Sequence, residues 1–161
     1  MPTNSNHNQS KDFDFIIGNW LVKHQKLLNP LSNSQEWIMF EGNSSTNKIL
    51  NGFGNLEDNV IHLPNQTYHA AAVRSYNSET NTWSIWWLDS RFPEIMGIPV
   101  VGTFKNRIGT FYANEIFKGK GIKVRFIWNA TEPSVPKWEQ AFSLDDGVTW
   151  ETNWIMHFHK E

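Results

Sequence analysis

Arg74 and Asp89 are the residues whose types and predicted placement best suit them to chemistry. Residues 68–76 and 83–90 have the pattern of two hairpin strands, and pairing Tyr76 with Trp83 puts both charged groups on one face with Trp87. A carboxylate on an aromatic inner face has its protonation tuned by burial and by a neighbouring guanidinium, so Asp89 is a candidate acid or base. The same pair is equally suited to orienting a ligand or to a purely structural role.

A second pattern with chemical potential is His157-Phe158-His159, which places two imidazoles on one strand face. Two ligands do not make a metal site, and the sequence does not bring a third one close. The other histidines considered are His24, His62 and His69. An exposed terminal strand is the simpler interpretation, and no metal is expected.

Other catalytic patterns are missing from the sequence. There is no Gly-x-Ser-x-Gly elbow, and the carboxylate pair Glu139 and Glu151 falls on the predicted outer wall. The glycines of residues 51–54 lack the spacing of a phosphate-binding loop. No cofactor is expected, and whether the protein is an enzyme stays open, with binding favoured over catalysis.

Composition restricts the partners of this chain. Its 161 residues carry 14 basic and 16 acidic side chains, for a net charge of -2, and contain no basic run. A chain with this charge lacks the basic surface that binds nucleic acid or an anionic membrane, so neither is an expected partner. The chain has no cysteine and begins with a polar segment that does not resemble a signal peptide. A cytoplasmic protein is therefore expected.

The elements that must position these residues are almost all strands. Residues 1–11 are expected to form a flexible tail, and residues 12–161 a single domain that begins with a helical turn ended by Gly18. Residues 56–65 have scattered aliphatic residues and predict a connecting loop, as do residues 91–99. The expected strands are residues 20–28, 36–45, 46–50, 68–76, 83–90, 100–105, 110–117, 122–129, 137–144 and 149–159. This meander of nine or ten strands predicts an antiparallel up-and-down β-barrel.

The nine tryptophans are expected to divide between the two faces of this barrel. Trp20 is predicted to plug one end, and Trp86 to point outward. A three-residue turn at residues 145–147 would place three pairs opposite one another on the inner face: Phe142 with Trp150, Gln140 with Thr152, and Trp138 with Trp154. The rings expected to line the interior are Trp87, Trp128, Trp138, Trp150 and Trp154.

Several segments resemble a known family. They are Phe13-Asp14-Phe15-Ile16-Ile17-Gly18-Asn19-Trp20, Trp83-Ser84-Ile85-Trp86-Trp87-Leu88-Asp89, and Trp138 to Ser143 followed by Gly147 to Trp154. Gly18-Asn19-Trp20 is similar to the Gly-x-Trp signature of the lipocalins, and the whole set resembles a family of bacterial proteins of unknown function with a lipocalin-like (calycin) barrel. The resemblance implies the fold, and it supplies no functional residues beyond the structural Gly18 and Trp20.

These observations predict a protein that binds a small hydrophobic or aromatic molecule inside the barrel. Aromatic rings would supply contact area, and Arg74, Asp89 and Gln140 would orient polar groups. The predicted ligand-binding residues are Tyr68, Arg74, Trp87, Asp89, Trp128, Trp138, Gln140 and Trp154. One alternative is an isomerase, decarboxylase or hydrolase that uses Asp89 beside Arg74. Another is a structural module or homodimer joined through Trp86.

Overall fold

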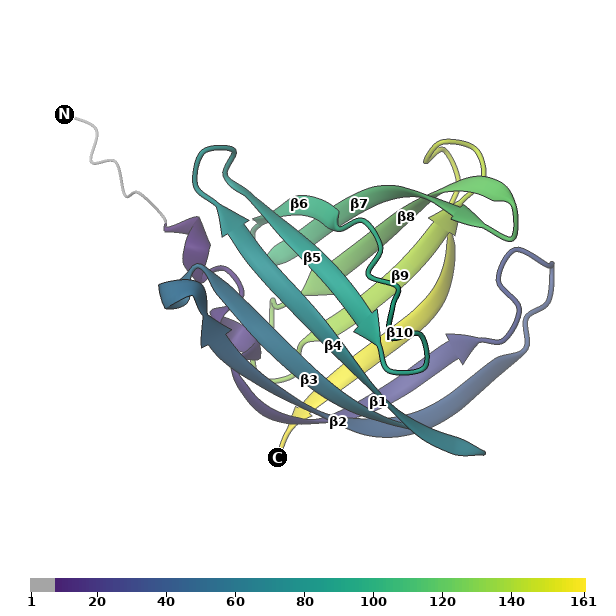
Figure 1. Ribbon diagram of the computed structural model, residues 1–161, viewed down its shortest axis with the longest axis horizontal. Coiled ribbons are helices and arrows are strands. Elements are labelled where there is room, and N and C mark those ends of the chain that lie inside the picture. Colours follow the sequence, from purple (N-terminus) through teal and green to yellow (C-terminus); the bar gives the residue numbers. More distant parts are fainter. Residues whose placement is uncertain (1–7) are drawn as a thin grey trace.

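The computed structural model describes residues 8–161, which form a closed antiparallel barrel of ten strands (Figure 1). Each strand pairs with its neighbours in sequence, and β1 pairs with β10, so the up-and-down barrel predicted from the sequence is confirmed. The strands are β1 (Gly18–Leu27), β2 (Trp37–Ile49), β3 (Gly54–Leu63), β4 (Gln66–Asn77), β5 (Thr82–Asp89), β6 (Val100–Lys105), β7 (Ile108–Phe117), β8 (Lys120–Asn129), β9 (Lys137–Ser143) and β10 (Glu151–Lys160).

The pairing between neighbouring strands is shortest between β5 and β6. Only residues 83–85 of β5 pair with β6, and Leu88 forms an isolated bridge with Met96. The rest of β5 borders the loop of residues 90–99, which the sequence predicted to be irregular. A loop therefore forms part of the barrel wall at this point. A continuous strand ladder does not join this loop to β5.

Short helical turns at the N-terminus cover one end of the barrel (Figure 1). The turn η2 (Asp14–Ile16) ends before Gly18, whose φ of 123° requires glycine, which confirms the predicted turn. A preceding turn, η1 (Gln9–Lys11), is capped by the Asn8 side chain. The predicted tail of residues 1–11 therefore includes η1, and residues 1–7 of that tail lie outside the described residues.

Aromatic rings close this end of the barrel. The ring of Phe13 meets those of Trp83, Phe104 and Phe111 with centroids 4.8–5.8 Å apart. Trp20 is fully buried against Phe158, and its indole nitrogen donates to the Ile16 carbonyl oxygen at 2.8 Å. These contacts place Trp20 in the plug that the sequence predicted. We call the end covered by these rings the closed end.

The prediction of a loop at residues 56–65 is wrong, because residues 56–63 belong to β3 and only the last two form a turn. The predicted short strand of residues 46–50 is likewise the end of β2, followed by the turn η3 (Leu50–Gly52). The inward residues of β3 include Asn55, Glu57 and Asn59, all buried. A strand whose inner face is polar does not show the hydrophobic alternation by which strands are found in a sequence.

The predicted register of the last hairpin is wrong as well. Phe142 lies opposite Glu151 and not Trp150, so the connection is longer than the predicted three-residue turn. A bulge in β10 between Thr152 and Trp154 then shifts the pairing by one more residue, which places Gln140 opposite Trp154 and Trp138 opposite Met156. A bulge inserts an extra residue and changes which side chains point inward. Asn153 is consequently buried, although alternation assigned it to the outer wall.

Trp150 is also misplaced by the predicted register. It packs on the outside of the barrel, where the Arg125 guanidinium lies 4.4 Å from the centre of its ring. Its ring also lies near Tyr112, which is nearly half exposed. Trp150 therefore does not line the interior.

Candidate functional site

The end of the barrel opposite the aromatic plug contains a cavity of about 920 Å³. Its walls come from β5 to β10 and from two connections at this end, the loop of residues 90–99 and the hairpin between β7 and β8. The lining residues are Ile85, Trp87, Asp89, Phe92, Ile95, Gly97, Ile98, Val100, Glu115, Ile116, Phe117, Lys118, Val124, Phe126, Trp138, Gln140 and Trp154. We call this space the open cavity, because Phe92, Ile95 and Ile98 at its rim are more than half exposed.

Three tryptophans from different strands meet in the wall of the open cavity. The Trp154 ring is edge-on to Trp87 at 5.8 Å and edge-on to Trp138 at 5.4 Å. Trp154 points inward on β10 together with Met156 and Phe158, which are also buried. T-shaped pairs of this kind are favourable arrangements of aromatic rings, so the three rings support one another in the cavity wall.

Trp154 is fixed from behind by a buried histidine. Its indole nitrogen donates to His24 Nδ1 at 3.2 Å, and the His24 ring stacks on Phe40 at 4.7 Å. Burial, followed by repulsion from Lys26, lowers the pKa of His24 to about 3. His24 is therefore neutral at physiological pH, and its Nδ1 can accept the hydrogen bond. The Lys26 ammonium lies 4.1 Å from the Trp154 ring centre.

Gln140 supplies a neutral polar group to the cavity wall. Its Nε2 donates to Asn153 Oδ1 at 2.9 Å, an amide pair created by the bulge. The sequence identified Gln140, but it gave no signal for Asn153 because strict alternation places residue 153 outside. Among the described residues, the Asn153 Nδ2 atom is buried without a partner.

Asp89 lies in the cavity wall, but its partner is Arg91 and not Arg74. Arg91 donates to both carboxylate oxygens, at 3.1 and 2.8 Å, and its guanidinium lies 3.6 Å from the centre of the Tyr68 ring. Burial raises the pKa of the Asp89 carboxyl, but hydrogen bonds and the charge of Arg91 outweigh it and hold the pKa below its usual value. Burial raises the pKa of Tyr68 to about 12. This cluster fixes the start of the loop of residues 90–99.

Arg74 is buried further inside the barrel. Its ion-pair partner is Glu57 and not Asp89, the partner considered from the sequence. Its guanidinium donates to Glu57 at 2.7 Å and to Asn55 at 2.8 Å, and it faces the rings of Phe13 and Trp128. The predicted hairpin register is correct, since Tyr76 does pair with Trp83. However, Asp89 pairs with Ala70, four residues along β4 from Arg74, which is roughly 13 Å. The two charges share a face without meeting.

The eight predicted ligand-binding residues divide into three groups. The residues that line the open cavity are Trp87, Asp89, Trp138, Gln140 and Trp154. Arg74 and Trp128 line a small enclosed cavity of about 20 Å³ nearer the closed end. Tyr68 is buried under Arg91 and lines neither space. Sequence reasoning missed the apolar side chains of the loop of residues 90–99, for which the only signal was several apolar residues within a predicted loop.

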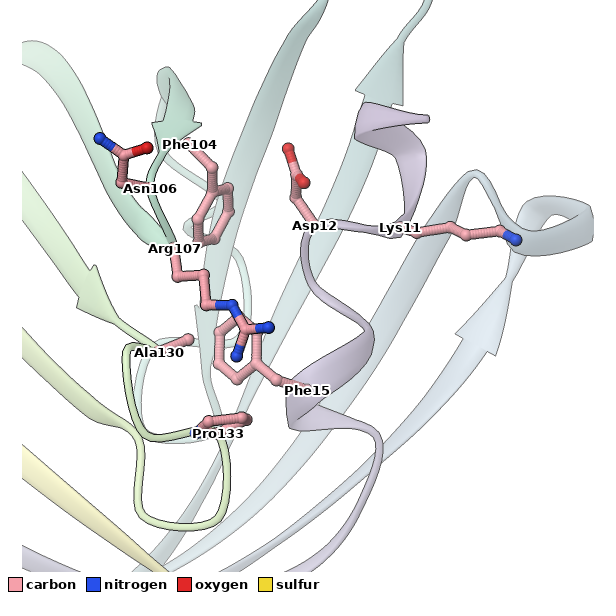
Figure 2. Close-up of a pocket in the computed structure, with 8 residues that line it drawn as sticks. All are labelled: Lys11, Asp12, Phe15, Phe104, Asn106, Arg107, Ala130 and Pro133. Carbon is pink, nitrogen blue, oxygen red and sulfur yellow. The ribbon is translucent and has the colours of Figure 1, made fainter. Parts of the chain in front are cut away.

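A second surface cavity, of about 520 Å³, lies at the closed end. Its lining residues come from the N-terminal turns, the β6–β7 hairpin and the loop after β8 (Figure 2). In Figure 2 the Lys11 side chain points away from the other lining residues. This cavity borders Phe15 and Phe104, which pack with the aromatic plug, so it does not enter the barrel.

The predicted histidine pair forms no larger cluster. Across residues 8–161, no group of three His, Cys, Asp or Glu side chains is arranged to hold a metal ion. Burial and the nearby Lys137 lower the pKa of His157.

Comparison with known proteins gives no family for this chain. No protein-family model matches it, and no curated protein does. Within the part of the chain that the structure describes, no helix has the length and apolar character needed to cross a membrane. The interpretation of the site therefore depends on its geometry.

Proposed function

We propose that this protein binds a small hydrophobic or aromatic molecule in the open cavity. The observation that carries the proposal is a cavity of about 920 Å³ walled by Trp87, Trp138 and Trp154, in a barrel whose other end is filled by packed rings. Sites for small molecules are typically concave and mostly apolar, with a few polar groups that set orientation.

The charges of the cavity wall favour a ligand that is uncharged where it is enclosed. The Asp89 carboxylate is already neutralised by Arg91, and Gln140 is a neutral amide. Burying a charged group without a partner costs several kcal/mol. The remaining charged lining residues, Glu115 and Lys118, are exposed, and they lie at the rim.

Binding of the fluorescent probe N-phenyl-1-naphthylamine tests this proposal. We expect the probe to gain fluorescence in the cavity and to quench tryptophan emission, and we expect Trp87→Ala to weaken binding about tenfold through the loss of ring contact. Trp86→Ala is the matched control, because residue 86 alternates to the outer face of β5. Absence of saturable binding, or equal weakening by both variants, would contradict the proposal.

The catalytic alternative loses its geometric basis in this structure. It required Arg74 beside Asp89, and each of these residues has a different partner. With its pKa held low by Arg91, the Asp89 carboxylate is ionised at neutral pH and is not a general acid.

A further inference from the structure

The inner face of β2, β3 and β4 carries a buried polar wall. Thr46 lies opposite Glu57, and Ser44 lies opposite Asn59 across β2 and β3. Asn55 lies opposite Arg74 across β3 and β4. All six residues are at most 3% exposed. A barrel that only needed a stable core would place apolar side chains at these positions.

Four atoms of this polar wall have no hydrogen-bond partner among the described residues. They are Ser44 Oγ, Thr46 Oγ1, Asn59 Nδ2 and Arg74 Nε. An unpaired buried polar group costs about 1–3 kcal/mol, so proteins rarely keep several together without a partner. The Asn59 amide and Arg74 Nε are donors, and the two hydroxyls can donate as well. The wall therefore lacks an acceptor.

A small enclosed cavity lies against this wall. Its volume is about 20 Å³, and of the polar wall it borders Glu57 and Arg74. The other lining side chains, Ala72 included, are aliphatic or aromatic. A space of this size holds one water-sized group. We call it the inner chamber.

The inner chamber adjoins the open cavity. Four residues line both spaces, namely Ile85, Trp87, Phe126 and Trp138. The separation between the two spaces thus consists of side chains and not of backbone. Trp87 lies on β5 beyond Ile85, where β5 is no longer paired with β6, and its side chain is only half-buried.

We propose that the ligand carries a neutral hydrogen-bond acceptor, a carbonyl or hydroxyl oxygen, which enters the inner chamber and accepts from Arg74 Nε. This inference rests on the proposed function, and it places the apolar body of the ligand in the open cavity among the three tryptophans. The acceptor is uncharged because Glu57 already balances the charge of Arg74 at 2.7 Å. A second carboxylate in the chamber would leave an uncompensated buried negative charge.

A series of three naphthalene probes tests the inference on the unmodified protein. We expect 2-acetylnaphthalene, which has a neutral carbonyl, to bind roughly tenfold more tightly than naphthalene, the gain typical of one hydrogen bond to a charged donor. We expect 2-naphthoate at neutral pH to bind more weakly than 2-acetylnaphthalene. Affinities are measured by quenching of tryptophan emission.

A matched pair of variants shows where any preference arises. Ala72→Val adds two methyl groups at the wall of the inner chamber, and Ala71→Val adds them on the outer face of β4. Ala72→Val is expected to bind naphthalene like the unmodified protein while losing the preference for 2-acetylnaphthalene, and Ala71→Val is expected to keep that preference. Thermal unfolding of both variants checks that each is folded.

The outcomes separate this inference from the proposed function. If none of the three probes binds, the proposed function fails. If naphthalene and 2-acetylnaphthalene bind equally, or if 2-naphthoate binds most tightly, the cavity binds ligands but the inference is overturned. If Ala72→Val does not fold, a crystal structure of the unmodified protein with 2-acetylnaphthalene decides instead: a water molecule in the chamber with the carbonyl elsewhere overturns the inference, and the carbonyl oxygen beside Arg74 supports it.

Discussion

The two ends of this barrel use the same residue type for different purposes. At the closed end, Trp20, Trp83 and Trp128 are buried among phenylalanine rings, and at most 2% of each residue is exposed. At the open end, Trp87, Trp138 and Trp154 border a large cavity. The difference shows that aromatic richness alone does not indicate a ligand site. Rings that pack fully against one another form a core, whereas rings that border a cavity can contact a ligand.

The N-terminal turns account for much of this difference. The Phe13 ring lies inside the barrel beside Trp83, Phe104 and Phe111, so a side chain of the protein itself fills the closed end. The loop of residues 90–99 places Phe92 at the wall of the open cavity, but this side chain is more than half exposed and lies at the rim. The barrel is therefore filled at one end and hollow at the other, and the loop of residues 90–99 borders the hollow end.

The largest expected effect comes from removing a ring from each end. Trp20→Ala should lower the free energy of unfolding by about 3–5 kcal/mol, because it leaves a cavity in a packed region. Trp87→Ala should lower it by only about 1–2 kcal/mol, since its ring borders an existing cavity and loses less packing. Urea unfolding measures both. Equal losses would mean that the open end is packed like the closed end.

A pH dependence of stability is the next largest effect, and it comes from His24 at the open end. The folded protein holds the pKa of His24 at about 3, below its ordinary value of 6.5 in the unfolded chain. The unfolded state therefore binds a proton that the folded state does not, and stability falls as the pH drops from about 6.5 toward 3. Between pH 7 and pH 5 the loss from this residue is about 2 kcal/mol.

Urea unfolding at pH 7 and at pH 5 measures this dependence. His24→Asn is expected to lower stability at both pH values and to flatten the change between them. His62→Asn is the control, because it replaces an exposed histidine and leaves His24 in place. An unchanged slope in His24→Asn would show that His24 is not held neutral behind Trp154.

The smallest expected effect concerns the loop at the mouth of the open cavity. Asp89→Asn weakens the pairing with Arg91, and since that pair is partly exposed the stability should fall by no more than about 1 kcal/mol. The amide groups of residues 90–99 should exchange with solvent faster. Asp58→Asn, an exposed carboxylate of β3, is the control. Unaltered exchange in Asp89→Asn would mean that the Arg91 cluster does not fix the loop.

Some features of both ends could be predicted from the sequence, and others could not. The meander, the Trp20 plug and the pairing of Tyr76 with Trp83 follow from local signals, namely strand alternation, turn residues and a helical turn before glycine. The register of the last hairpin does not follow, because the connection before Glu151 is longer than a three-residue turn and β10 has a bulge before Trp154. The polar wall was missed for a related reason. Asn55, Glu57 and Asn59 are buried polar residues, and hydrophobic periodicity assigns such residues to loops or to the surface.

Arg74 illustrates the limit for candidate sites. The sequence placed it correctly on the inner face with Asp89, but the partner of a buried charge is chosen by cross-strand neighbours, and Glu57 lies on a strand that the sequence did not predict. Strand alternation can thus show that a charged residue points into the barrel and still not show which residue it pairs with.

The most direct test of the difference between the two ends is NMR of the tryptophan indole NH signals during titration with N-phenyl-1-naphthylamine. The account predicts that the signals of Trp87, Trp138 and Trp154 shift on binding, while those of Trp20 and Trp83, whose indole nitrogens donate to backbone carbonyls of Ile16 and Gln9, stay in place. Shifts confined to the closed end or to the outer Trp86 and Trp150, or no shift at saturating probe, would contradict it.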